Sequence, residues 1–238
     1  MGDLPLEYDV LPHGILLKNE VSVKNTTIGD IRFIGPVIIG KDSYIGNCCI
    51  IGYPDRTHLL KGEIKVTKIG KKSVIRPFSI IYEDVTIGDQ FETGSHVQIR
   101  EGSRIGNQVR VGTHSILERD VKIGNRVRIH SNNFISEYTV IGDDVWISPC
   151  VSILNDKYPV TDKLIGPRIE QGAIIGANTI IFPGLLIGRN AVVAAGSLVT
   201  KDAPPESLVV GSPAKPYLTR AAYNQKQRSW VEESIRRR

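Results

Sequence analysis

Aliphatic side chains recur at every sixth position over most of this chain. The longest series occupies positions 69 to 153, and Thr93 is its single non-aliphatic member. The pattern also covers positions 39–51 and 169–199. A period of six fits neither the 3.6-residue period of an amphipathic helix nor the two-residue alternation of an ordinary strand. Short β segments that turn a corner after every six residues do fit it, because each aliphatic side chain then points inward.

Three such segments make a triangular coil, and stacked coils make a parallel β-helix, an all-β solenoid. Small or β-branched residues such as Ser73 and Val85 stand two positions before many of the aliphatic residues, and glycine often follows. We expect glycine, asparagine and aspartate to supply the turn conformations at the corners. Neighbouring coils should lie about 4.8 Å apart, which is the strand spacing of a sheet.

Residues one coil apart in the sequence should therefore stack on each other. The sequence offset predicts one ladder of His96, His114 and Asn132. It predicts a second ladder of Glu137 and Asn155.

The repeat is missing at both ends and is interrupted twice. We expect residues 1–27 to form an N-terminal cap, residues 28–201 to form the solenoid, and residues 202–238 to form a C-terminal segment that ends in a helix. The interruptions at 52–68 and 154–168 should protrude as loops. Loops on a rigid scaffold often carry function.

Composition and charge exclude several classes of protein. No apolar run is long enough to span a membrane, and the acidic start MGDLPLEYDV has no signal-peptide pattern, so we expect a cytoplasmic protein without a membrane partner. The three cysteines form neither a CxxC pair nor a disulfide framework. The net charge of +5 comes without a nucleic-acid recognition motif and would suit small anionic ligands.

The repeat, the second interruption and the ending VVGSPAKP at 209–216 together resemble the hexapeptide-repeat acyltransferases, over about residues 28–220. The resemblance implies a left-handed β-helix and a homotrimer in which acetyl-CoA, the co-substrate, meets a small-molecule acceptor between subunits. It implies no metal. The cofactor contacts that it implies are Gly176, Ala177, Ala194, Ala195, Lys201, Lys215 and Arg220.

Residues 127–159 are most similar to N-acetyltransferases that modify the 3-amino group of nucleotide-linked amino sugars, enzymes that usually serve surface glycan synthesis. The likeness lies in HSNN, FISEYT and NDKYP. It implies that His130, Glu137 and Asn155 surround the amine and carry the catalysis. The substrate contacts that we expect are Asn132, Asn133, Asp156, Tyr158 and His114, with Tyr53 and Arg56 of the first interruption against the nucleotide.

The second interruption favours an amine acceptor over an alcohol. Sugar O-acetyltransferases of the resembled family commonly place a catalytic histidine in this loop, whereas this chain has Asn155-Asp156-Lys157-Tyr158 there. A neutral amine attacks a thioester without a strong base, so groups that orient it suffice. The proton can go to His130, whose ordinary pKa is near neutral, or to the departing thiolate.

Three other interpretations stay open. An O-acetyltransferase would use His114 or His130 as its base. A zinc enzyme that hydrates carbon dioxide would use His96, His114 and His130, although their spacing does not match that branch of β-helix proteins. A non-catalytic scaffold would leave the loops and the GSPAK ending unexplained. Uridine and thymidine nucleotides, several sugars and amine positions, and acyl groups other than acetyl are all compatible with the sequence.

Overall fold

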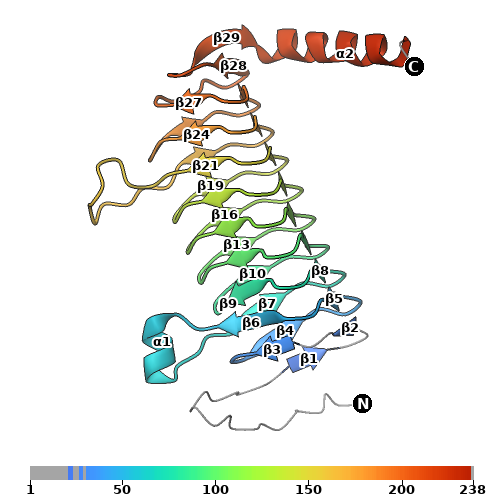
Figure 1. The fold of residues 1–238 in the computed structure, drawn as a ribbon, viewed down its shortest axis with the longest axis vertical. Helices are drawn as coiled ribbons and strands as arrows, with labels where there is room; N and C mark the ends of the chain where they lie inside the picture. The colour runs from blue at the N-terminus through green and yellow to red at the C-terminus, as the bar shows by residue number, and fades with distance from the viewer. Residues whose placement is uncertain (1–20, 24–26, 29–30, 237–238) are drawn as a thin grey trace.

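Three parallel sheets form the sides of a triangular solenoid in the computed structural model, which describes residues 21–23, 27–28 and 31–236 (Figure 1). Sheet A contains β1 (Val21–Val23), β4 (Val37–Ile39), β7 (Thr67–Ile69), β10 (Thr86–Ile87), β13 (Arg104–Ile105), β16 (Lys122–Ile123), β19 (Val140–Ile141), β22 (Arg168–Ile169) and β25 (Leu186–Ile187).

The other two sides are sheets B and C. Sheet B contains β2 (Thr27–Ile28), β5 (Tyr44–Ile45), β8 (Val74–Ile75), β11 (Glu92–Thr93), β14 (Arg110–Val111), β17 (Arg128–Ile129), β20 (Trp146–Ile147), β23 (Ile174–Ile175), β26 (Val192–Val193), β28 (Ser207–Val210) and β29 (Lys215–Thr219). Sheet C contains β3 (Ile31–Phe33), β6 (Cys49–Tyr53), β9 (Ile80–Tyr82), β12 (Gln98–Ile99), β15 (Ile116–Leu117), β18 (Phe134–Ile135), β21 (Ser152–Ile153), β24 (Ile180–Ile181) and β27 (Leu198–Val199).

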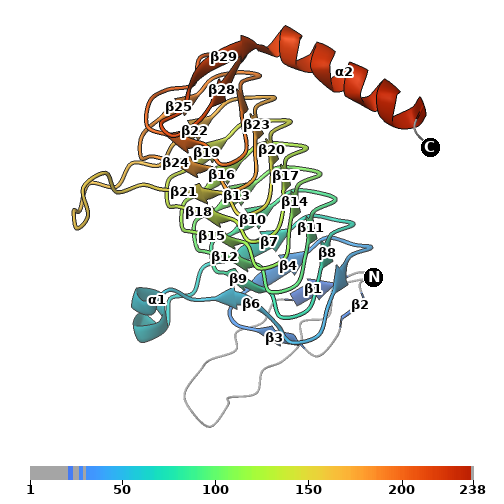
Figure 2. The same ribbon diagram turned by 45° about the horizontal axis from the view of Figure 1, so that its top comes forward.

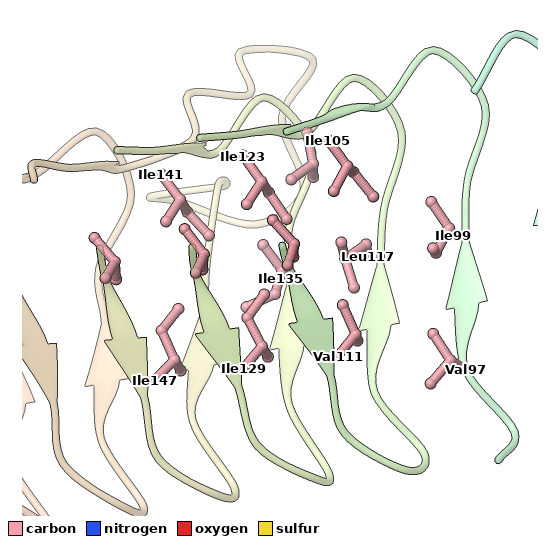
Figure 3. Packing of buried hydrophobic residues seen from close by; sticks show 14 of the residues in the cluster. Val97, Ile99, Ile105, Val111, Leu117, Ile123, Ile129, Ile135, Ile141 and Ile147 are labelled. Carbon is pink, nitrogen blue, oxygen red and sulfur yellow. The ribbon is translucent and has the colours of Figure 1, made fainter. Parts of the chain in front are cut away.

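The register follows the predicted offset, since Ile87 pairs with Ile105 and Ile105 pairs with Ile123. The predicted fold class, a left-handed parallel β-helix of hexapeptide repeats with protruding loops and a C-terminal helix, is confirmed. The inward aliphatic residues form one continuous column, part of which Figure 3 shows. Ile99, Ile135 and Ile147 are fully buried in it. Each such side chain contributes about 1.5–3 kcal/mol through burial. Thr93 keeps its place by accepting a hydrogen bond from the Arg76 amide at 2.9 Å.

The repeat glycines do not have the role that we predicted from the sequence. Corner residues such as Asn132 and Gly102 do adopt left-handed φ angles, of 60° and 74°. Gly70 and Gly112, which follow the inward aliphatic residues, do not. A Cβ on Gly112 would lie 2.4 Å from the carbonyl carbon of His130. The repeat glycines are therefore required by the close approach of the next coil.

Both interruptions leave the solenoid at the same corner, where sheet C ends and sheet A of the next coil begins; we call it the C–A corner. Figures 1 and 2 show the two protrusions on the same side of the molecule. The first contains the helix α1 (Arg56–Lys61), which Asp55 caps by accepting a 2.7 Å hydrogen bond from the His58 amide. The second, residues 154–167, contains no helix.

The end of the solenoid follows the expected order. The strand β28 continues sheet B, the antiparallel strand β29 pairs with it, and the helix α2 (Arg220–Arg236) then projects away from the coils (Figure 1). At the other end, β1 already pairs with β4 inside the segment for which we predicted a cap. The remainder of the predicted cap, apart from β2, lies outside the described residues. Among the described helices, none has the length and apolar character needed to cross a membrane.

Candidate functional site

A cleft of about 970 Å³ lies between the outer face of sheet B and the start of α2. We call it the B-face cleft. Its apolar wall is formed by outward-facing strand residues, including Trp146, Ile174 and Val192. Its other wall is the first part of α2, with Arg220, Tyr223 and Gln227. Five of the predicted cofactor contacts line this cleft: Gly176, Ala177, Ala194, Ala195 and Arg220.

Small residues and free amides meet at the corner between sheets B and C, which we call the B–C corner. The Ala194 amide donates to the Val209 carbonyl, as the coil requires. The amides of Ala177 and Ala195 have no such acceptor among the described residues. The Ser148 amide, in contrast, donates to the Ile175 carbonyl at 2.9 Å. Two stacked donors are thus available to a ligand that lies close to the coil.

Arg220 places a positive charge at the rim of the B-face cleft. Its guanidinium donates to the carbonyl oxygens of Asn190 at 2.8 Å and Gly172 at 3.3 Å, and to Asn224 at 2.9 Å. No carboxylate pairs with it among the described residues. On the opposite wall, which the coils form, the hydrogen bond from Arg126 lowers the pKa of Asp144, so that carboxylate stays ionised and paired. The fixed cation at Arg220 suits a phosphate.

The other two predicted cofactor contacts do not line this cleft. Lys201 follows β27 and therefore lies at the C–A corner, across the coil. Lys215 is the exposed first residue of β29.

His130 adjoins the cleft from the coil before it. Its ring lies 4.7 Å from the ring of Trp146, which lines the cleft, and its side chain is half-buried at the B–C corner. The histidine ladder predicted at this corner is present, since the rings of His96 and His114 lie 4.9 Å apart. His114 and Asn132 are exposed there.

Asn133 serves the coil and does not face a ligand. Its side chain is 2% exposed. Its amide nitrogen donates to the His130 carbonyl at 2.5 Å, and its oxygen accepts from the Val151 amide at 2.8 Å. Substrate contact at this position would require breaking both bonds, so the structure assigns Asn133 to the support of His130.

Glu137 lies at the C–A corner, where it pairs with Arg119 at 2.8 Å. No hydrogen bond or ion pair joins Glu137 to Asn155 among the described residues, and the chain enters the loop directly after β21. The returning arm covers this corner instead, since a Cβ on Gly166 would lie 2.3 Å from the Thr139 amide nitrogen. One coil below, burial raises the pKa of Glu118. The corner is therefore a row of paired carboxylates and guanidinium groups.

The loop at 154–167 is held in shape by Asp156. That carboxylate accepts hydrogen bonds from the amides of Tyr158 at 3.1 Å and Thr161 at 3.0 Å, and from the Thr161 hydroxyl at 2.9 Å. The Thr161 amide bond lowers the pKa of Asp156. Asp156 is thus the residue that shapes the loop, while Tyr158 is exposed at its tip.

Asn155 lines a second cleft, of about 450 Å³, which lies at this loop. We call it the loop cleft. The two arms of the loop are joined by the hydrogen bond from the Ile165 amide to the Asn155 carbonyl, at 2.8 Å. Lys157, Tyr158 and Lys163 also line the cleft.

The first interruption is clamped by a buried carboxylate. Glu83, 1% exposed, accepts from the amides of Asp55 and Lys65 and contacts His58 Nδ1 at 2.6 Å. These bonds account for the cluster of Asp55, His58 and Glu83, which has a geometry that could also hold a cation. Beside it, Tyr53 packs edge-on against Tyr82, and Arg56 is exposed on α1.

One chain does not bring the three predicted catalytic residues together. His130 precedes β18 at the B–C corner, and Glu137 follows β18 at the C–A corner. Asn155 follows β21 on the same side as Glu137. His130 thus lies at the start of the strands of sheet C, whereas Glu137 and Asn155 lie at their ends.

The motifs of the sequence do not include the residues that α2 and sheet B add to the B-face cleft. Trp146, Tyr223 and Gln227 carry no motif. Trp146 stands at an outward strand position, where a single exposed apolar residue is common and gives no signal of a site. Tyr223 and Gln227 depend on the direction in which α2 leaves the solenoid.

Comparison with known proteins finds the same hexapeptide repeat. Residues 168–201 match the family described as the hexapeptide repeat of succinyl-transferase. The chain is similar to a protein of Schizosaccharomyces pombe that bears the name of an acetyltransferase, with 40% identity over 84 residues, which are 32% of this chain and 41% of that protein. It is similar to protein CapG of Staphylococcus aureus, with 50% identity over 76 residues, 32% of this chain and 44% of that protein. The chain thus matches less than half the length of these two relatives.

Among solved structures, the chain resembles LpxA of Bacteroides fragilis, a UDP-N-acetylglucosamine acyltransferase. The TM-score is 0.56 at 20% identity, over 74% of this chain and 76% of that one. At this identity the likeness establishes the shared fold. It agrees with the hexapeptide-repeat β-helix predicted from the sequence.

Proposed function

We propose that this protein is an acetyl-CoA-dependent N-acetyltransferase that acts on the amino group, at C3, of a nucleotide-linked amino sugar. The observation that carries the proposal is the B-face cleft. Its small corner residues, its two free amides and its guanidinium fit the parts of a coenzyme A thioester. The name of the Schizosaccharomyces pombe relative supports acetyl transfer.

Acetyl-CoA lies along sheet B with its pantetheine arm against the B–C corner. The free amides of Ala177 and Ala195 donate to the amide carbonyl groups of that arm. Arg220 faces a phosphate of the coenzyme. The acetyl end then points toward Trp146, which lines the cleft, and toward His130, which adjoins the cleft from the preceding coil.

The acceptor amine is held at the loop of residues 154–167. That loop lacks histidine and places the amide of Asn155 in a cleft beside the carboxylate corner of Glu137. Both groups can orient an amine. A sugar hydroxyl would depend on Glu137 as its base, and that carboxylate is paired with Arg119. Tyr53 and Arg56 lie along the same corner, but five coils of about 5 Å each separate their loop from that of Asn155, so the nucleotide contact predicted for them is not part of this proposal.

The complete site needs a second copy of the chain. His130 and Asn155 lie at opposite ends of the strands of sheet C. The B–C corner of one subunit must therefore face the C–A corner of the next. Such head-to-tail contacts close into a ring, and a homotrimer satisfies them. For a nucleotide-sugar substrate, we further propose that the enzyme acts in the cytoplasm, in glycan biosynthesis.

Transfer follows from this arrangement. The neutral amine attacks the thioester carbonyl carbon, a C–N bond forms, and the carbonyl oxygen becomes an oxyanion. The C–S bond then breaks and coenzyme A leaves as a thiolate. The surplus ammonium proton passes to His130 or to that thiolate, which gives the amide and free coenzyme A.

Thiol release tests the proposal. Purified protein is mixed with acetyl-CoA and a panel of nucleotide-linked 3-amino and 4-amino sugars, each beside its hydroxyl counterpart. The proposal expects release with a 3-amino sugar, none with the hydroxyl sugar, and loss of release in Asn155→Ala. Release with the hydroxyl sugars alone would favour an O-acetyltransferase, for which His114 and His130 are the candidate bases.

A further inference from the structure

The loop cleft carries a positive charge that the fold does not use. Lys157 and Lys163 both line it, and neither ammonium group pairs with a carboxylate among the described residues. The Lys157 ammonium lies over the Tyr158 ring, at 5.5 Å from its centroid. Most other charges at this corner are neutralised, for example Arg119 by Glu137 and Arg100 by Glu101.

The cleft is also held open by the fold. The arms of the loop pair through Asp156 and Leu164, and the returning arm is fixed to the coils because the Gly184 amide donates to the Ile165 carbonyl at 2.9 Å. Asp156, next to Lys157 in sequence, accepts hydrogen bonds from the loop itself with both oxygens. Asp162, next to Lys163 in sequence, forms no ion pair with it among the described residues and does not line the cleft. A rigid cleft with two unpaired cations is preorganised for an anion.

We infer that the loop cleft is a phosphate subsite for the acceptor, in which Lys157 and Lys163 bind the diphosphate that links sugar and nucleoside. This inference rests on the proposed function, because it takes the acceptor amine to lie at Asn155. A diphosphate on C1 of a sugar ring is separated from an amine on C3 by the C1–C2 and C2–C3 bonds. An acceptor whose amine reaches Asn155 therefore brings its diphosphate into the same cleft, beside the two lysines.

Coenzyme A is the other source of phosphate. Within one chain, the guanidinium of Arg220 lies in the B-face cleft, at sheet B, whereas the loop cleft lies beyond the C–A corner. In the proposed ring, the loop cleft of one subunit lies on the side that faces the B–C corner of the next, so the acetyl-CoA titration below decides between the two sources.

Calorimetry with nucleoside diphosphates tests the inference. UDP, TDP, inorganic pyrophosphate and acetyl-CoA are each titrated into the full-length wild-type protein, the double variant Lys157→Ala/Lys163→Ala, and the double variant Lys157→Arg/Lys163→Arg. Lys68→Ala/Lys122→Ala is the matched control, since it removes two exposed lysines from the outer face of sheet A.

We expect one nucleoside diphosphate to bind the wild-type protein and inorganic pyrophosphate to compete with it. Its Kd should rise at least about tenfold in the double alanine variant, stay within about threefold in the arginine variant and the control, and rise with salt. The Kd for acetyl-CoA should not change in any of them. An unchanged nucleotide Kd in the alanine variant, no binding to the wild-type protein, or a loss confined to acetyl-CoA would each overturn the inference.

The outcome is separable from that of the proposed function. Lysine-dependent nucleotide binding without transfer to any amine would refute the N-acetyltransferase and leave the subsite standing. Amine transfer with a KM for the acceptor that is unchanged in the alanine variant would refute the subsite alone.

Discussion

Replacing Asn133 distinguishes a structural role of this residue from a role in substrate binding. In Asn133→Ala, the Val151 amide loses its acceptor at a fully buried position. The His130 carbonyl loses one donor and keeps the Ser115 hydroxyl at 2.9 Å. One buried amide without a partner costs about 1–3 kcal/mol, and the missing side-chain atoms add a small cavity, so we expect a loss of about 2–4 kcal/mol.

The assay is guanidinium denaturation followed by circular dichroism, at one fixed protein concentration because an oligomer's stability depends on it. Asn132→Gly is the matched control. Asn132 is exposed with a φ of 60°, which glycine adopts freely, so its loss should change stability by less than about 0.5 kcal/mol. An Asn133→Ala protein as stable as wild type, with a raised KM for the acceptor, would refute the structural assignment.

Three further variants address the two clefts. Arg220→Ala should raise the KM for acetyl-CoA by about tenfold, because a charge-assisted contact is lost, whereas Arg228→Ala, exposed further along α2, should leave it unchanged. Asp156→Ala frees the amides of Tyr158 and Thr161 and should raise the acceptor KM by about tenfold through misplacement of the loop. The pKa of Asp156 is lowered from 3.8, so its hydrogen bonds stabilise the loop fully above pH 3.8, and this stabilisation is lost as the pH falls below that value. Hydrogen exchange of the amides of Tyr158 and Thr161 in acid measures the loss. His130→Ala should lower kcat by about 10²-fold if His130 takes the proton, and an unchanged kcat would assign the proton to the thiolate.

The solenoid could be predicted from the sequence because its periodicity is long and strict. The inward column, the coil register and the places of both loops all follow from counting in sixes. The role of the repeat glycines could not be predicted in the same way. Turn conformation and close backbone approach both select glycine, and only the distance from Gly112 to the next coil separates them.

The sequence indicated some of the residues that line the B-face cleft, but not the arrangement of the candidate site. The corner glycine and alanines of the B-face cleft were identified, whereas Tyr223 was not, since no repeat fixes the direction of α2. Glu137 and Asn155 are one coil apart in number, but the loop begins directly after β21, so the repeat does not fix the position of the Asn155 side chain. His130 is seven residues from Glu137, but β18 lies between them, so the two residues are at opposite ends of that strand.

The most direct test of the account is complementation between two inactive variants. His130→Ala and Asn155→Ala are purified separately, unfolded, mixed in equal amounts, refolded together and assayed for thiol release with acetyl-CoA and a 3-amino nucleotide sugar. If His130 of one subunit works with Asn155 of the next, random mixing restores both residues at about a quarter of the sites. The account predicts about that fraction of wild-type activity. Activity no higher than that of the separately refolded variants, with mixed oligomers shown to form, would contradict it.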